Sequence, residues 1–175
     1  MLFLHLFSAL SPYEQTKYEG TVPQQSSWDC GPAAAATVLE LAGITPSPWP
    51  ENTPNQTISL ALLADYFHDH GLEAVGYKVN WEQLQYFFEN FPNRPLLAHR
   101  SSDEGHFVVL LGFAGKYPVL ADPSAGLRVL APSLFRKDFQ GYILHFPQLP
   151  ELNRVQELLF LGGQRLNLLQ NTINF

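Results

Sequence analysis

The sequence predicts an α+β domain in which an N-terminal helical lobe packs on a C-terminal antiparallel sheet. Three observations predict this class. Helical patterns occupy most of residues 31–88, apolar runs with a period of two occupy residues 95–146, and glycines and prolines separate those runs. A block of helices followed by a block of strands is typical of an α+β domain rather than of alternating β–α units.

The helical lobe is expected to hold three helices. The first spans 31–42: Pro32 suits its first turn, its alanines favour helix, and Gly43 can cap its end. It is apolar nearly all round, so we expect it to be buried. Four prolines make 44–57 a loop. A second helix is expected at 59–71, and a third at 81–88 with Asn80 as its N-cap, after a short strand at 73–79.

The sheet is expected to use the apolar runs 95–99, 106–113, 118–121, 127–130 and 141–146. The short connection 114–117 makes the second and third runs a hairpin. A tail begins at Glu151 and contains an amphipathic helix at 153–161, which Gly162 and Gly163 are expected to interrupt. We therefore divide the chain into a domain at 1–150 and a C-terminal helical tail at 151–175.

Composition excludes several classes of protein. The 175 residues carry a net charge of −6 with no cluster of Lys or Arg, so neither nucleic acid nor an anionic lipid surface is an expected partner. No apolar run approaches the ~18 residues of a membrane span. Residues 1–11 are apolar but lack a basic start, so a secretory signal is not expected there. A single cysteine excludes an intrachain disulfide.

That cysteine, Cys30, lies at the start of the buried helix. Free backbone N–H groups and the positive end of the helix dipole stabilise a thiolate there, and the N–H of Cys30 could face an oxyanion. A lone buried cysteine is more often a small hydrophobe, so catalysis needs partners. Among six histidines His106 is best placed, because it begins the longest apolar strand, and Asp122 ends the strand paired with it.

Three segments resemble the bacteriocin-processing cysteine peptidases, which cut leader peptides after a Gly-Gly pair. They are QQSSWDCGPAA at 24–34, HFVVL at 106–110 and ADPSAG at 121–126, and the match covers roughly residues 20–146 in order and spacing. The resemblance implies a papain-like fold, a Cys30–His106–Asp122 triad and Gln24 as the side-chain oxyanion donor. It also implies a bacterial source, a peptide or protein substrate, and a stand-alone peptidase that works with a separate exporter.

Other functions stay open at this point. An amidase or acyl transferase could use the same residues, because a fold and a triad do not fix the acyl acceptor. A non-catalytic module that binds leader peptides is the alternative from a different class. None of the three needs a metal or an organic cofactor. The substrate, the oligomeric state and the compartment, whether bacterial cytoplasm or cell envelope, are not fixed by the sequence.

Simpler interpretations apply to the remaining polar motifs. Asp29 is expected to be the N-cap of the first helix. His68 and His70 are two residues apart, so they do not share a helix face as metal ligands would, and a solvated helix end is expected. His99, Asp103 and Glu104 are expected to belong to a polar loop rather than to contact a substrate.

Overall fold

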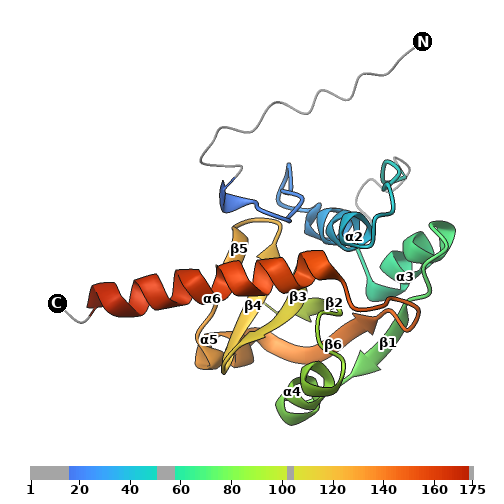
Figure 1. Ribbon diagram of the computed structural model, residues 1–175. Coiled ribbons are helices and arrows are strands. Elements are labelled where there is room, and N and C mark those ends of the chain that lie inside the picture. The colour runs from blue at the N-terminus through green and yellow to red at the C-terminus, as the bar shows by residue number, and fades with distance from the viewer. Residues whose placement is uncertain (1–15, 51–57, 102–104, 174–175) are drawn as a thin grey trace.

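The computed structural model describes residues 16–50, 58–101 and 105–173. The N-terminal segment 1–11 and the pair Asp103–Glu104 lie outside these residues. The elements run in the order α2 (Cys30–Leu41), α3 (Leu60–Asp69), β1 (Val75–Lys78), α4 (Trp81–Asn90), β2 (Leu96–Arg100), β3 (His106–Ala114), β4 (Tyr117–Asp122), β5 (Gly126–Val129), α5 (Pro132–Asp138), β6 (Phe139–His145) and α6 (Asn153–Ile173). The predicted α+β class is confirmed (Figure 1).

One six-stranded antiparallel sheet organises the molecule. Its strand order is β1-β6-β2-β3-β4-β5, so the expected β3–β4 hairpin forms and the last strand inserts between β1 and β2. Helices α2, α3 and α6 cover one face, and α4 and α5 cover the other (Figure 1). The sheet is therefore buried on both faces, which accounts for its nearly continuous apolar strands.

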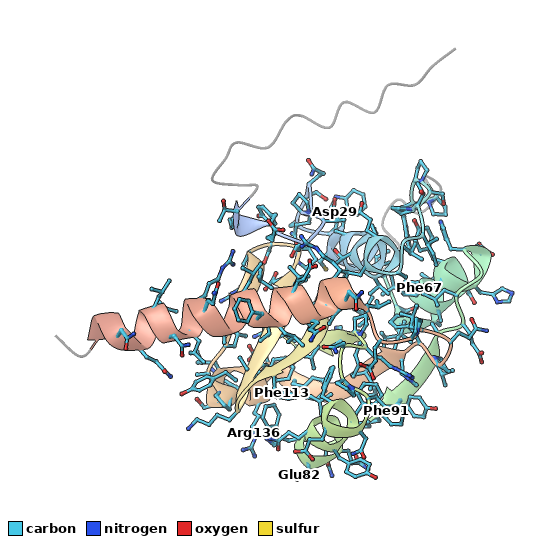
Figure 2. All side chains as sticks on the ribbon, viewed as in Figure 1. Asp29, Phe67, Glu82, Phe91, Phe113 and Arg136 are labelled. Carbon is cyan, nitrogen blue, oxygen red and sulfur yellow. The ribbon has the colours of Figure 1, made fainter. Side chains whose placement is uncertain are left out.

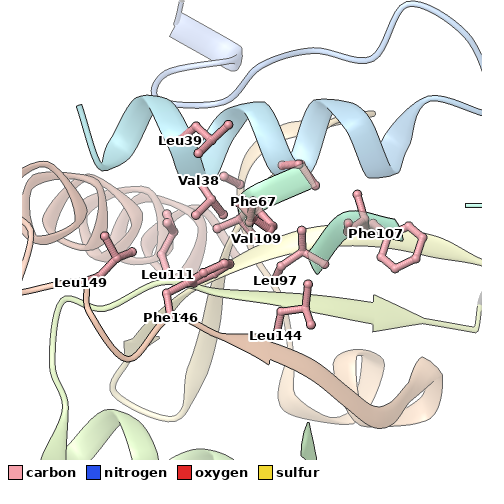
Figure 3. Packing of buried hydrophobic residues seen from close by; sticks show 14 of the residues in the cluster. Val38, Leu39, Phe67, Leu97, Phe107, Val109, Leu111, Leu144, Phe146 and Leu149 are labelled. Carbon is pink, nitrogen blue, oxygen red and sulfur yellow. The ribbon is translucent and has the colours of Figure 1, made fainter. Parts of the chain in front are cut away.

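The larger core lies between α2 and the sheet. Val38 and Leu39 of α2 meet Leu97, Val109 and other strand residues that alternate toward this face (Figure 3). The expected burial of the first helix is confirmed, since most of its residues are inaccessible. This core holds the N-terminus of α2 firmly against β3, which is the contact that matters for the site.

Local signals set the helix ends as predicted. Gly43 has a φ of +74°, and the N–H groups of Gly43 and Ile44 donate to the carbonyls of Glu40 and Leu39, which is a complete Schellman motif. Asn80 caps α4 in a capping box with Gln83. Residues 44–50 of the predicted loop are irregular, and 51–57 lie outside the described chain.

One helix was not predicted, and one expected helix break was wrong. Helix α5 was not predicted, because its seven residues bury only Phe135 and so show no periodicity. The predicted break at Gly162–Gly163 does not occur, because α6 runs unbroken to Ile173. A Cβ on Gly162 would lie 2.8 Å from Cγ1 of Val119, so glycine here allows close packing of the helix on the sheet. Within the described residues, no helix is both long and apolar enough to cross a bilayer.

Candidate active site

Cys30 is the first residue of α2 and is buried. Burial alone would raise the pKa of its thiol. Hydrogen bonds from the His106 side chain and from the backbone N–H groups of Phe107 and Gly31, together with the positive charge of His106, outweigh burial and lower that pKa. The surroundings of the sulfur therefore favour the nucleophilic thiolate.

His106 is the first residue of β3, and its side chain is only 15% exposed. Burial would lower the pKa of the imidazole, but hydrogen bonds to Asp122 and Cys30 and the charges of these two groups raise it to about 9. Nε2 lies 2.8 Å from Oδ1 of Asp122. Because Nε2 faces the carboxylate, Nδ1 is the ring nitrogen left for the sulfur.

Asp122 ends β4 and is 1% exposed. Its Oδ1 also accepts hydrogen bonds from the backbone N–H and the hydroxyl of Ser124, at 2.9 and 2.7 Å, and its Oδ2 accepts one from Nη1 of Arg128 at 3.2 Å. Burial would raise the pKa of this carboxyl, but the bonds from His106 and Ser124 and the charge of His106 hold it well below its usual range. Asp122 is therefore a fixed, ionised partner for the imidazole.

The pairing of β3 with β4, which contains a β-bulge, brings His106 near Asp122. The β3–β4 register shifts by one residue between Leu110 and Gly112. Beyond the bulge Val109 faces Ala121, and continuing that register sets Asp122 opposite Val108. Val108 is two residues from His106, so this pairing brings Asp122 close enough to His106 for the Nε2–Oδ1 hydrogen bond at the end of the two strands.

Gln24 lies in the loop before Cys30. Its backbone N–H donates to the carbonyl of Pro123 at 3.0 Å, which ties this loop to the turn after Asp122. Its side-chain Nε2 donates to the carbonyl of Ser26 at 2.8 Å. A primary amide has two N–H donors, so this bond leaves the second available.

Two expectations near the site need correction. Asp29 occupies the N-cap position of α2, but its side chain makes no capping bond and instead accepts from the N–H groups of Gln25 and Ser26, both at 3.0 Å. His99 is not in a loop: it belongs to β2, and its ring centroid lies 5.0 Å from that of Phe107. Burial and the charge of His106 lower the pKa of His99.

Sequence reasoning missed Ser124 and Arg128. A Ser two residues after an Asp is a turn signal that could have suggested the first contact. Arg128 gave no such signal, because its approach to Asp122 depends on the β4–β5 pairing. His70 also has a structural role: its Nε2 accepts the N–H of Ser47 at 3.0 Å. Throughout the described chain, no group of three His, Cys, Asp or Glu residues could hold a metal ion.

This arrangement has a definite chemical capacity. The Cys30 sulfur lies beside the His106 imidazole, whose Nε2 is hydrogen-bonded to the Asp122 carboxylate, and the pKa shifts of both groups favour the charged pair. Such a pair can attack a carbonyl carbon and then deliver a proton to the leaving group. The geometry therefore fits acyl transfer through a thioester.

Comparisons with known proteins agree with this chemistry. The sequence model of the Peptidase C39 family matches residues 19–150. The probable functional amyloid protease FapD of Pseudomonas aeruginosa is 27% identical over 150 residues, which cover 79% of this chain but only 65% of that protein. An uncharacterized protein of Methanothermobacter thermautotrophicus is 28% identical over 130 residues, covering 72% of this chain and 87% of that protein.

Solved structures share the fold. The crystal structure of a double glycine motif protease from an AMS/PCAT transporter, in complex with the leader peptide, aligns with a TM-score of 0.57 and 26% identity over 72% of this chain and 89% of that one. The peptidase domain of Streptococcus mutans ComA aligns with a TM-score of 0.59 and 21% identity over 73% and 98% of the two chains. The expected papain-like fold is confirmed by these likenesses.

Proposed function

The chain belongs to the Peptidase C39 family, and on that premise we propose that it hydrolyses peptide bonds with Cys30 as nucleophile, His106 as acid and base, and Asp122 as the orienting carboxylate. That it is a cysteine peptidase follows from the family and from the related peptidase domains. The observation that carries the assignment of residues is the hydrogen-bonded chain from the Cys30 sulfur through His106 to Asp122.

The proposed reaction has two halves. The Cys30 thiolate adds to the scissile carbonyl carbon, and the oxyanion accepts hydrogen bonds from the Cys30 N–H and the free N–H of the Gln24 amide. The intermediate collapses, the carbon–nitrogen bond breaks, and His106 protonates the leaving amine. Neutral His106 then removes a proton from water, which attacks the thioester and releases the new carboxylate with the thiolate restored.

We propose that the substrate is a leader peptide cut after Gly-Gly. The support is the three-segment resemblance at 24–34, 106–110 and 121–126. A related double glycine motif protease, 26% identical, was crystallised with its leader peptide, which adds to this support. Such a substrate would be handed to a separate exporter after cleavage.

A peptide assay tests the proposal. Synthetic peptides that contain a Gly-Gly pair, and matched peptides with Ala-Ala at the same place, are incubated with wild-type protein and with Cys30→Ala, and the products are read by mass spectrometry. We expect Cys30-dependent cleavage after Gly-Gly and little after Ala-Ala. Hydroxylamine should trap the thioester as a hydroxamate at the same position.

The other outcomes separate the alternatives. Equal cleavage of both peptides would contradict the Gly-Gly preference but keep the peptidase. Products formed only with an added amine, and never with water, would identify an acyl transferase. Peptide binding without any cleavage would identify a leader-binding module.

A further inference from the structure

The Asp29 carboxylate lies directly before Cys30, where its charge needs an explanation. A negative group beside a thiolate disfavours the charged sulfur, so by charge alone Asp29 opposes nucleophile activation. Nor does it cap the helix, since its side chain accepts no hydrogen bond from α2. Figure 2 labels Asp29 near the start of this helix. Asp29 therefore has a role other than stabilising the thiolate or capping the helix.

The hydrogen bonds of the Asp29 carboxylate indicate what it does in this loop. Oδ2 of Asp29 accepts the N–H of Gln25 and Oδ1 accepts the N–H of Ser26, both at 3.0 Å. The two bonds close the segment 25–29 into a ring in which the carboxylate occupies the centre. Hydrogen bonds from neutral N–H groups to an ionised carboxylate are stronger than neutral ones, so this ring is held firmly.

The ring in turn determines how the Gln24 amide is oriented. Nε2 of Gln24 donates to the carbonyl of Ser26 at 2.8 Å, and Ser26 is one of the two residues that Asp29 holds. Oε1 of Gln24 is buried and has no hydrogen-bond partner among the described residues. With the oxygen unheld, the bond to Ser26 is the contact that fixes the rotation of the amide, and it leaves the second N–H directed elsewhere.

We propose that Asp29 is a positioning residue that holds the Ser26 carbonyl in place, so that the Gln24 amide presents its free N–H to the oxyanion. This inference rests on the proposed function, because it gives Asp29 a role only if Gln24 stabilises an oxyanion. It separates two properties of the site: Asp29 serves acyl transfer through Gln24 and does not promote the reactivity of the Cys30 thiolate.

Two reactions distinguish these properties. Acylation by N-acetyl-glycylglycine p-nitrophenyl ester passes through an oxyanion, whereas alkylation by iodoacetamide consumes the thiolate without forming one. The full chain is measured in both reactions as wild type, Asp29→Ala, Asp29→Asn, Gln24→Ala and the double variant Asp29→Ala with Gln24→Ala. Glu40→Ala is the matched control, because it removes the same charge from the exposed far end of α2.

The expected pattern is specific. Gln24→Ala should slow acylation by about 100-fold, the usual effect of losing one oxyanion donor, and Asp29→Ala should slow it by at least about 10-fold. In the Gln24→Ala background, Asp29→Ala should cost no more than about twofold, because residues that act through one another are not additive. Asp29→Asn, which retains an acceptor for Ser26, should recover most of the rate. Alkylation should be undiminished in every variant.

Several results would overturn the inference. If Asp29→Ala slows alkylation as much as acylation, Asp29 only maintains the general fold around Cys30. If the two substitutions multiply in the double variant, Asp29 does not act through Gln24. If Gln24→Ala itself leaves acylation unchanged, the proposed role of Gln24 fails first, and that result is distinct from a failure of Asp29 alone.

Discussion

At the scale of single residues, burial and hydrogen-bond partners have opposite effects on the pKa values of the site residues. Cys30 and His106 are both largely withdrawn from water, which would raise the pKa of the thiol and lower that of the imidazole. Hydrogen bonds reverse both shifts, chiefly the bond from His106 for Cys30 and the bond to Asp122 for His106. Asp122 favours the protonated imidazole, since its carboxylate is buried, ionised and held by four donor groups. The result favours the thiolate–imidazolium pair over two neutral groups.

These pKa shifts predict a bell-shaped dependence of kcat/KM on pH. The acid limb should lie below the ~8.5 of a free cysteine, because protonation of Cys30 removes the nucleophile. The alkaline limb should lie at about 9, where His106 loses its proton. In Asp122→Asn the negative charge is gone, so the alkaline limb should move down toward the ~6.5 of an ordinary imidazole. An alkaline limb that does not move would contradict the role of Asp122.

At the scale of elements, glycines decide how closely α6 approaches the sheet. Gly162 faces Val119 and Val129, and a Cβ on it would approach Cγ1 of Val119 to 2.8 Å, whereas a Cβ on Gly163 would meet no atom within 4 Å. Val119 is fully buried and β-branched, so it cannot rotate away cheaply. The two adjacent glycines therefore allow a controlled comparison, because a Cβ would clash at Gly162 and would not at Gly163.

The pair predicts opposite changes in stability. Gly163→Ala should raise the free energy of unfolding by up to about 1 kcal/mol through helix propensity alone. Gly162→Ala gains the same propensity but overpacks the interface with β4, which typically costs about 1–3 kcal/mol, so it should be neutral or destabilising. Urea denaturation of both variants measures the difference. Equal stabilisation by both would show that α6 is not packed against Val119.

Elements were predictable where the signal is local. Periodicity, Asn80 and Gly43 gave the helices and their ends, and the runs of apolar residues gave the strands. Pairing between distant strands, such as β1 with β6, leaves no local mark. Nor did the β-bulge between Leu110 and Gly112 leave a local mark in the sequence. The pairing of His106 with Asp122 was thus predicted from the hairpin, whereas the register of that hairpin was not.

The role of Asp29 could not be predicted from the sequence either, although its partners are only three and four residues away. An Asp just before a helix is normally an N-cap, and nothing in the sequence separates that role from a carboxylate that turns back to bind Gln25 and Ser26. Contacts of this kind depend on the path of the loop, which the tie between Gln24 and Pro123 helps to set.

At the scale of the whole molecule, α6 completes the larger core. The tail predicted at 151–175 contributes Val155 and Leu158 to that core, and both are fully buried. It lies beside α2 on the same face of the sheet, so one layer of helices supports both the fold and the proposed nucleophile (Figure 1).

Removal of α6 should therefore destabilise the entire fold. A chain that ends at Leu152 loses two fully buried aliphatic side chains, each worth about 1.5–3 kcal/mol, and exposes strand residues beneath them. We expect its free energy of unfolding to fall by at least about 3 kcal/mol, as measured by urea denaturation against the full chain. A truncated chain of unchanged stability would show that residues 1–150 form the complete folding unit.

The central claim is that Cys30 and His106 form an ion pair, and the rate of Cys30 alkylation by iodoacetamide as a function of pH tests it most directly. The wild type should titrate as a thiolate with a pKa well below the ~8.5 of a free cysteine, and His106→Ala should abolish that shift. Slow alkylation with an ordinary pKa, unchanged by His106→Ala, would contradict the account.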